Sequence, residues 1–286
     1  MKTIIGSFIA IFVFGMIAIG QTTKTNSKNT IIVQSIESSV SVESLSESAD
    51  IISNRLKDFK SKRFTISVIP ENNQIKVTLK GDWDENFTKD LIVQKGTLAC
   101  YETYSRKDLS ILLSDGYNFF STYNSKYGSD SSSEIVCVSL EDVEKINDNL
   151  NSNALDRKCK FVWGRQSASS ATCLYALKTI GDEGAILKGT DIASMSYTQN
   201  KTFKFYEVHL RLNESGADLW ADATRRNVNK TIAFVLDDKL YSAPIVNAPI
   251  IGGRASISSN FSKSEAAYIA SLGKNGELPI DLKIIK

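Results

Sequence analysis

Short β-rich runs alternate with amphipathic helical patterns in the first third of the chain, and this alternation constrains the fold more than any other feature. A β-branched run at 30–36 precedes a helical pattern at 43–60, where apolar residues recur every three or four positions with polar residues such as Arg55 between them. Two segments of alternating apolar residues follow at 64–68 and 75–79. Because only a turn separates them, they predict a β-hairpin.

A second helical pattern completes the order of elements in this part of the chain. It covers 84–95 and stops at Gly96, and another β-rich run follows at 97–103. The resulting order, β-α-β-β-α-β, is typical of a ferredoxin-like fold. We therefore expect a first ferredoxin-like subdomain at 21–104 and an α+β fold class.

The last hundred residues show the same order again. A run at 206–212 alternates apolar and polar residues, and Asn213 is a candidate N-cap for the helix that follows. Two further β-rich runs at 231–236 and 239–242 flank Asp237 and Asp238. Adjacent acidic residues between β-rich runs are more simply explained as a hairpin turn than as a metal site.

The closing segment predicts one more strand, a helix and a final strand. A β-rich run at 255–258 precedes a capping box formed by Ser262 and Glu265, which opens the helix. The second ferredoxin-like subdomain is therefore expected at 187–286. Its final strand at 278–286 either stays in this subdomain or returns to the first one.

An irregular connecting region is expected between the two subdomains, at 105–186. Its middle is rich in Ser, Tyr, Gly and Asp and offers little to bury. One short helix is predicted at 140–150.

The N-terminus reads as an export signal. An uncharged apolar run at 4–19 is followed by small residues at Ala18 and Gly20, which predicts a signal peptide at 1–20 cut between Gly20 and Gln21. The alternative is an uncleaved N-terminal anchor, because the run approaches the roughly 20 residues that span a bilayer. In both cases we expect the rest of the chain outside the cytoplasm. Membrane contact is expected only through this segment, and only if it is uncleaved.

The charge balance excludes a strong attraction to polyanions. The chain has 34 Lys and Arg against 32 Asp and Glu, a formal charge of +2. A protein that binds nucleic acid usually presents a marked basic excess. We expect no nucleic-acid partner.

The four cysteines are expected to form disulfides, because an oxidising compartment favours pairing of an even number. A zinc site is a weaker interpretation, since the chain has one histidine and no CxxC pair. Cys159 and Cys173 flank a predicted hairpin and are the first candidate pair, which leaves Cys100 with Cys137. This is one of three connectivities, and buried free thiols are the alternative.

No residue pattern predicts catalysis or a cofactor. The only histidine, His209, lies on the outward face of its predicted strand, and no nucleophile accompanies it in the sequence. The segment from Gly252 to Arg254 lacks the Lys-Ser/Thr end of a phosphate loop and is interpreted as a flexible turn. We expect a protein that is not an enzyme and binds no cofactor or metal.

An ordered set of residues in the C-terminal hundred carries a resemblance to a known family. The set is Gly189, Gly216, Asn227, Asp237, Ser242, Pro244, Gly252, Gly253, Phe261 and Pro279. It closely resembles the first periplasmic domain, with its base and head, of the protein-export translocase subunit SecD and of SecDF fusions. The segments at 52–56, 75–79 and 96–101 resemble the base of that domain more loosely. The family continues into membrane helices, which we expect this chain to lack.

The resemblance implies a function as well as a fold. It implies a non-enzymatic accessory of protein translocation that binds unfolded or emerging secretory polypeptide, with the Sec translocon as a partner, in the periplasm or at the extracytoplasmic face of the inner membrane. The alternative is a secreted scaffold or interaction protein that retains this fold without a translocation role.

Overall fold

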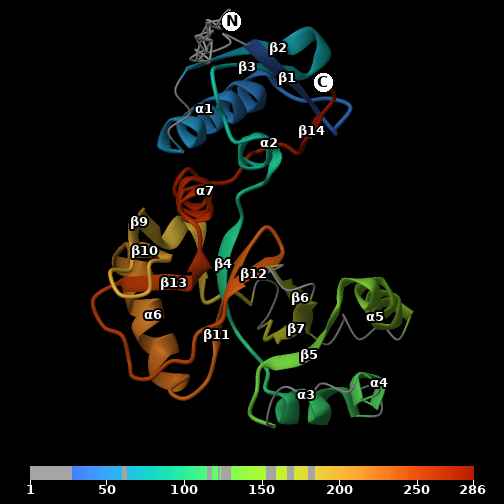
Figure 1. The fold of residues 1–286 in the computed structure, drawn as a ribbon, viewed down its shortest axis with the longest axis vertical. Helices are drawn as coiled ribbons and strands as arrows, with labels where there is room; N and C mark the ends of the chain where they lie inside the picture. The colour runs from blue at the N-terminus through green and yellow to red at the C-terminus, as the bar shows by residue number, and fades with distance from the viewer. Residues whose placement is uncertain are drawn as a thin grey trace, which may run out of the picture.

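The described part of the chain forms an α+β structure with three sheets. The computed structural model describes residues 28–59, 63–114, 118–121, 123, 130–152, 159–165, 171–179 and 184–286. The predicted signal peptide at 1–20 and its cleavage site at Gly20 and Gln21 lie outside these residues. Figure 1 shows a smaller upper part, here called the base, and a wider lower part, with α7 between them.

The base contains a four-stranded sheet with the order β14-β1-β3-β2, in which all neighbouring strands are antiparallel. Helices α1 and α2 share its hydrophobic core. Its elements are β1 (Lys28–Ser35), α1 (Val42–Asp58), β2 (Phe64–Ile69), β3 (Gln74–Lys80), α2 (Glu85–Val93) and β14 (Leu282–Ile284). The helices begin where side chains cap them: Ser41 accepts a hydrogen bond from the backbone of Ser44, and Asp84 from that of Phe87.

The strand predicted at 97–103 is present as β4 (Leu98–Glu102), but the prediction that it closes the base sheet is wrong. It pairs with β11 (Ile232–Leu236) and β8 (Leu187–Lys188) instead. All five residues of β4 are buried, so the strand needs a central position with both faces covered. The fourth strand of the base is β14, whose Ile284 pairs with Val33.

Strand β4 belongs to a seven-stranded sheet with the order β5-β7-β6-β12-β11-β4-β8. Its remaining members are β5 (Glu134–Ser139), β6 (Lys160–Gly164), β7 (Ala171–Leu177) and β12 (Lys239–Ser242). Strands β6 and β12 pair in parallel, with Lys239 opposite Trp163. This sheet joins the predicted connecting region to the C-terminal part of the chain.

The third sheet has the order β13-β10-β9, and we call this sheet, together with the helices near it, the head. Its strands are β9 (Ile192–Gln199), β10 (Tyr206–Leu212) and β13 (Arg254–Phe261), and the helices near it are α6 (Glu214–Arg226) and α7 (Lys263–Lys274). The predicted second subdomain differs here, because β10 and the β11-β12 hairpin do not share a sheet. Strand β11 is buried at every position, with Phe234 in the main core and Val235 in a second core, so both of its faces are covered. It pairs with β12 on one edge and with β4 on the other.

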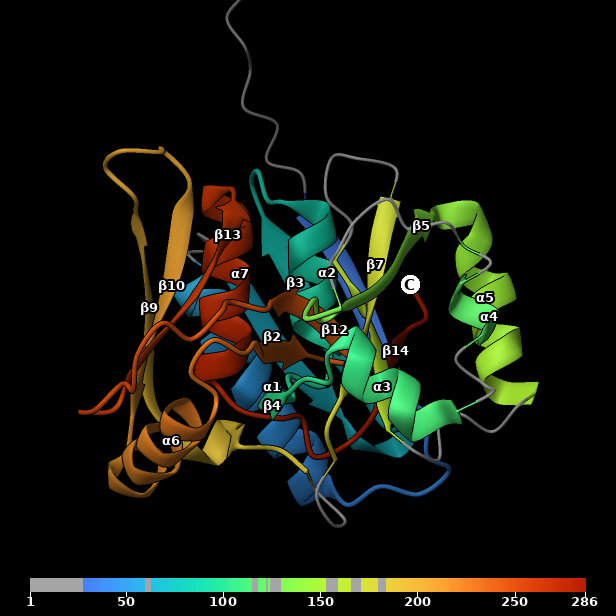
Figure 2. The ribbon, with the colours of Figure 1, turned by 90° about the horizontal axis from the view of Figure 1, so that it is seen from below.

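The region at 105–186 is more ordered than predicted. Besides β5, β6 and β7 it contains α3 (Arg106–Leu113), α4 (Asn118–Ser121) and α5 (Leu140–Ser152). These elements enclose a core of their own, which includes Leu109, Phe120, Ile146 and Leu174. Figure 2 shows α3, α4 and α5 at the side of the molecule opposite β9 and β10. We call this region the connecting module.

A disulfide is present, but the predicted pairing is wrong. Cys137 is bonded to Cys173, and Cys100 and Cys159 are free and buried. The register of the sheet explains the difference: Cys173 lies directly opposite Cys137 in the β5-β7 pair. In the β6-β7 hairpin Lys160 pairs with Leu177, the last residue of β7. Cys159 therefore lies past the end of β7 that is remote from Cys173.

The two free thiols, Cys100 and Cys159, have low reactivity because both are buried. Burial raises the pKa of Cys100 and raises that of Cys159 to about 12. Since the thiolate is the reactive form, both side chains behave as small apolar core residues.

Over the described residues, no helix has the length and apolar character needed to cross a membrane.

Candidate functional site

Two segments of the chain cross between the base and the lower part, and Arg55 binds both. This buried side chain of α1 donates to the carbonyl oxygens of Gln94 at 2.7 Å and Lys95 at 2.8 Å on the outgoing segment. It also donates to the carbonyl of Gly276 on the returning segment, at 2.6 Å. The backbone of Leu278 donates to the Lys95 carbonyl at 2.8 Å, so the two crossings also bind each other.

Asp237 joins the β11-β12 hairpin to the same crossing. Asp237 and Asp238 have φ angles of 47° and 60°, which confirms the predicted turn. The Asp237 carboxylate accepts hydrogen bonds from the backbone of Gly96 and Thr97, both at 2.8 Å. Burial raises the pKa of Asp237, although these donors and Arg55 act in the opposite direction. The sequence predicted the turn but not this contact.

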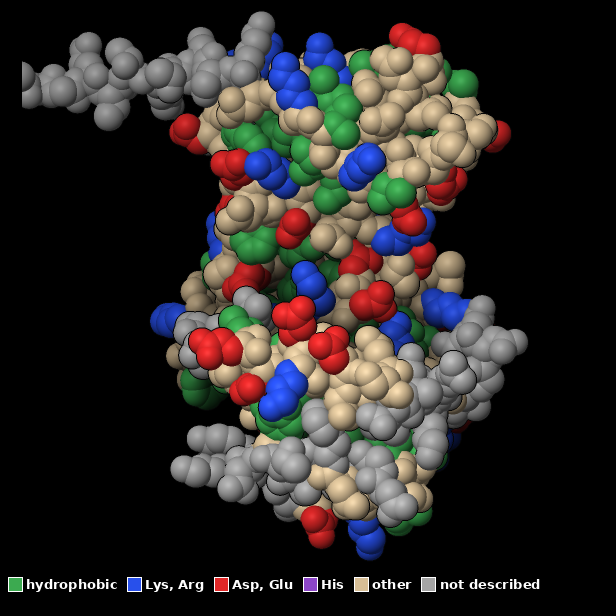
Figure 3. Space-filling model, turned by 90° about the vertical axis from the view of Figure 1, so that its right-hand side faces the viewer, with side chains coloured by type: hydrophobic (Ala, Val, Ile, Leu, Met, Phe, Trp, Pro, Cys, Tyr) green, Lys and Arg blue, Asp and Glu red, His purple; other side chains and the backbone are tan. Residues whose placement is uncertain are grey.

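A cleft of about 450 Å³ opens beside these two crossing segments, where the base, α7, strand β12 and the connecting module meet. The residues that line it come from α2, α5, β6, β7, β12 and α7. They are Phe87, Leu140, Val143, Trp163, Gly164, Arg165, Thr172, Lys239, Tyr241, Glu265 and Tyr268. Figure 3 shows hydrophobic side chains in the recess at the waist of the molecule, with charged side chains of both signs around it.

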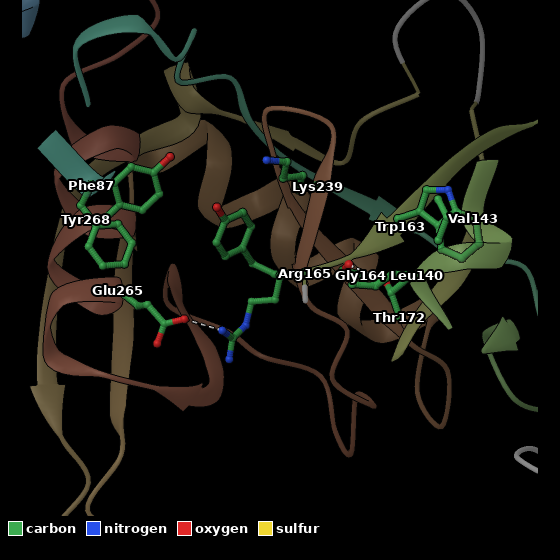
Figure 4. A pocket seen from close by; sticks show the side chains of 11 residues that line it. Phe87, Leu140, Val143, Trp163, Gly164, Arg165, Thr172, Lys239, Glu265 and Tyr268 are labelled. Atoms are coloured by element: carbon green, nitrogen blue, oxygen red, sulfur yellow. Dashed lines mark hydrogen bonds and ion pairs between the residues drawn. The ribbon is translucent and has the colours of Figure 1, made fainter. Parts of the chain in front are cut away.

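The walls of the cleft are largely aromatic. Phe87 and Tyr268 lie on one side, with ring centroids 5.2 Å apart, and Trp163 lies on the other side (Figure 4). Burial raises the pKa of Tyr241 to about 12 and also raises that of Tyr268, so both hydroxyls stay protonated and uncharged at neutral pH.

Arg165 connects the connecting module to α7 across the cleft. Its guanidinium forms an ion pair with Glu265 at 2.5 Å and donates to the hydroxyl of Ser259 at 3.2 Å (Figure 4). The same group lies 4.7 Å from the ring centroid of Phe261. The ion pair is mostly shielded from solvent, so the charges compensate each other inside the cleft.

Several residues of the family-like set are framework residues. A Cβ on Gly216 would lie 2.6 Å from the carbonyl oxygen of Asp191, and one on Gly253 would lie 2.9 Å from the Cβ of Ala217. The buried Asn227 ends α6 and donates to the Ala223 carbonyl at 2.8 Å. These three residues therefore allow close packing around α6.

The rest of the set holds turns and strand contacts. Ser242 donates to the carbonyl of Ser258 at 2.7 Å, and the carbonyl of Pro244 accepts from Ile232 at 3.2 Å. Gly189 starts a short 3-10 turn, Gly252 has a φ of 92° and Pro279 lies in an exposed bend. Phe261 and Asp237 are the members that come near the cleft, through Arg165 and the crossing.

His209 has two hydroxyl partners that the sequence did not reveal. Its Nε2 lies 2.7 Å from the Thr198 hydroxyl and its Nδ1 lies 3.0 Å from that of Ser256. Over the described residues, no carboxylate hydrogen-bonds this imidazole. Glu134, Cys137 and Cys173 also cluster, but the two sulfur atoms are bonded to each other and do not offer thiolates to a metal.

The fold and the cleft define the class: a two-part α+β domain in which a base and a head enclose an aromatic recess. The family model described as SecDF, P1 head subdomain, matches residues 169–280. The resemblance to the first periplasmic domain of SecD and SecDF is therefore confirmed.

Curated relatives match about a third of the chain. The protein translocase subunit SecD of Leptotrichia buccalis is 37% identical over 101 residues, which are 35% of this chain and 25% of the relative. That of Rickettsia bellii is 41% identical over 104 residues, 36% of this chain and 20% of the relative. The chain thus spans a quarter or less of the length of these two relatives.

Solved structures share the fold over most of the chain. A structure described as that of a membrane component SecDF that enhances protein export has a TM-score of 0.53 at 21% identity, and the match covers 90% of this chain and 98% of that one. A crystal structure of SecDF in a super-membrane-facing form has a TM-score of 0.55 at 21% identity, over 92% of this chain and 30% of that one. The shared fold thus includes the base.

Proposed function

We propose that the chain is a non-enzymatic accessory of protein translocation, which holds unfolded or emerging polypeptide in the aromatic cleft. The observation that carries the proposal is this cleft, where Phe87 of the base faces Trp163 of the connecting module. The similarity of the chain to SecD and SecDF supports this role, an extracytoplasmic location and an association with the Sec translocon. We also interpret the strand order of the base as ferredoxin-like.

The chemistry of the cleft suits a client of variable sequence. Aromatic rings bury apolar side chains of many shapes, and they demand no fixed hydrogen-bond pattern. The uncharged hydroxyls of Tyr241 and Tyr268 can bind main-chain groups, which every polypeptide presents. The inner charges of Arg165 and Glu265 are already paired, so an apolar segment does not isolate either one.

The position of the cleft suggests why binding matters mechanically. Phe87 belongs to the base, Tyr268 to α7 and Leu140 to the connecting module. A polypeptide seated there contacts all three parts at once. Its binding therefore favours the arrangement of these parts that closes around it.

A binding assay with a rim variant tests the proposal. Leu140 is 40% exposed and is the first residue of α5, where an acidic side chain favours the helix. We expect Leu140→Asp to weaken binding of an unfolded secretory polypeptide, labelled with a fluorophore, by about tenfold or more, because a carboxylate replaces apolar contact area. Fluorescence anisotropy of the labelled polypeptide measures the affinity.

Leu219→Asp is the matched control, because Leu219 is 46% exposed on α6 and outside the cleft lining. It should bind as the unaltered chain does. Equal losses in both variants would remove the cleft from the proposal while leaving polypeptide binding intact. Absence of binding by the unaltered chain at high micromolar concentration would overturn the proposed function and favour a scaffold role.

A further inference from the structure

The tip of the β9-β10 hairpin presents a stacked pair of phenylalanines. Phe203 is 71% exposed, and its ring lies almost parallel to that of Phe205, with centroids 5.8 Å apart. A second aromatic pair, Tyr197 and Tyr206, follows further from the tip, at 6.2 Å. Figure 2 shows the hairpin along the outer edge of the head. The exposed apolar group therefore stands on a projection and not in a groove.

The backbone of the tip is fixed by local hydrogen bonds. The side-chain oxygen of Asn200 accepts from the backbone of Thr202 and Phe203, both at 3.0 Å. The side-chain amide of Gln199 donates to the carbonyl of Lys204 at 2.9 Å. The tip is thus held in one shape that keeps Phe203 in solvent, although burying this ring would be favourable.

Two lysines flank the aromatic pair. Lys201 and Lys204 are exposed on either side of Phe203 in the turn. Over the described residues, no ion pair involves either of them. The tip therefore combines a protruding apolar ring with two uncompensated positive charges. Tyr197 and Tyr206 lie on β9 and β10, further from the turn.

We propose that this tip docks on an anionic lipid surface. A phenylalanine at the apex can enter the boundary between headgroups and acyl chains, while the amphipathic tyrosines favour the headgroup level. Lys201 and Lys204 then meet lipid phosphates, and charge complementarity selects anionic lipid over neutral lipid. A convex tip of this kind gives little contact to a single extended polypeptide, which binds better in a cleft.

This proposal goes beyond the proposed function and does not depend on it. Lipid docking would orient the head toward a membrane whether or not the cleft holds a client. It adds a second contact to any attachment through the N-terminal apolar segment, and paired weak signals are what make membrane attachment stable.

Fluorescence quenching by brominated lipid tests the proposal on the full chain. Phe203→Trp places a fluorophore at the tip, and the emission of the unaltered chain, with its three tryptophans, is subtracted. With vesicles of brominated phosphatidylglycerol we expect quenching of the added emission. In Phe203→Trp combined with Lys201→Gln and Lys204→Gln, half-maximal quenching should need about 30-fold more lipid, from about fivefold per lysine.

Ile251→Trp is the matched control. Ile251 is 80% exposed, and Gly253, two residues further on, accepts a hydrogen bond from the backbone of Leu212, at the end of β10 remote from the tip. Its added emission should not be quenched. Equal quenching at both positions, or equal quenching by brominated phosphatidylcholine, would overturn the proposal. So would a tip signal that responds to unfolded polypeptide and not to vesicles.

Discussion

At the scale of single residues, Arg55 joins the two segments that cross between the base and the lower part. Its guanidinium binds carbonyl groups of both crossing segments, and burial lowers the pKa of Arg55 to about 10, so it remains charged at neutral pH. We predict that Arg55→Met lowers the free energy of unfolding by about 3 kcal/mol or more, because several buried carbonyls lose their donor. Urea denaturation followed by circular dichroism measures the change.

Lys57 provides the control on the same helix. It is exposed, so Lys57→Met should change the free energy of unfolding by no more than about 0.5 kcal/mol. If both substitutions had the same small effect, Arg55 would not hold the crossing together.

Glu102 gives a prediction for pH. Burial raises its pKa, but the hydrogen bond from Arg226 at 2.5 Å, together with Asn227 and Lys178, outweighs burial and leaves the pKa lowered. A carboxylate that is more acidic in the folded state stabilises it above the unfolded pKa, and this contribution disappears as the pH falls through the folded pKa. Glu102→Gln should therefore be less stable than the unaltered chain at pH 7.

The difference between these two proteins should shrink as the pH is lowered below about 4.3, the usual pKa of glutamate. Thermal unfolding of both proteins between pH 7 and pH 3 measures it. A difference that stays constant or grows on acidification would contradict the role given to the Arg226 contact.

At the scale of elements, the missing side chain of Gly216 allows α6 to approach the turn at Asp191 closely. A Cβ at this position would lie 2.6 Å from a backbone oxygen, so Gly216→Ala should destabilise the protein by about 1–3 kcal/mol although alanine favours helices. Gly189→Ala is the control, since nothing lies within 4 Å of its added Cβ. Denaturant titration compares them, and a stabilising Gly216→Ala would show that α6 can move away freely.

Local signals predicted the elements well. The strand at 206–212, the Asn213 cap and the capping box of Ser262 with Glu265 all appear as expected. These features depend on residues a few positions apart, which the sequence displays directly. Sheet membership depends on contacts between distant segments. The fully buried runs at 98–102 and 232–236 were identified as strands, but their mutual pairing was not predictable from alternation.

The site was much less predictable than the elements. Arg55 occupied a polar position in a helical pattern, and Asp237 fitted a turn, so neither suggested a shared crossing. The aromatic residues of the cleft are Phe87, Trp163, Tyr241 and Tyr268, which are far apart in the sequence. The cysteine pairing failed for the same reason, because it is set by the register of three strands.

At the scale of the whole molecule, the head and the connecting module are inserted in the sequence between α2 and β14, which both belong to the base. Both crossings pass Arg55, and the cleft opens beside them. Figure 1 shows that the base holds the first and last strands of the described chain. The base is therefore joined to the lower part through a narrow waist, and the cleft lies next to the two segments that cross it.

Site-specific photo-crosslinking tests the central claim most directly. A photoreactive amino acid in place of Lys239 lies in the cleft, and one in place of Lys230 is an exposed control outside its lining. With an unfolded secretory polypeptide, we predict strong crosslinks from position 239 and few from position 230, and an excess of unlabelled polypeptide should compete them away. Equal yields from the two positions, or crosslinks at 239 that resist competition, would contradict the account.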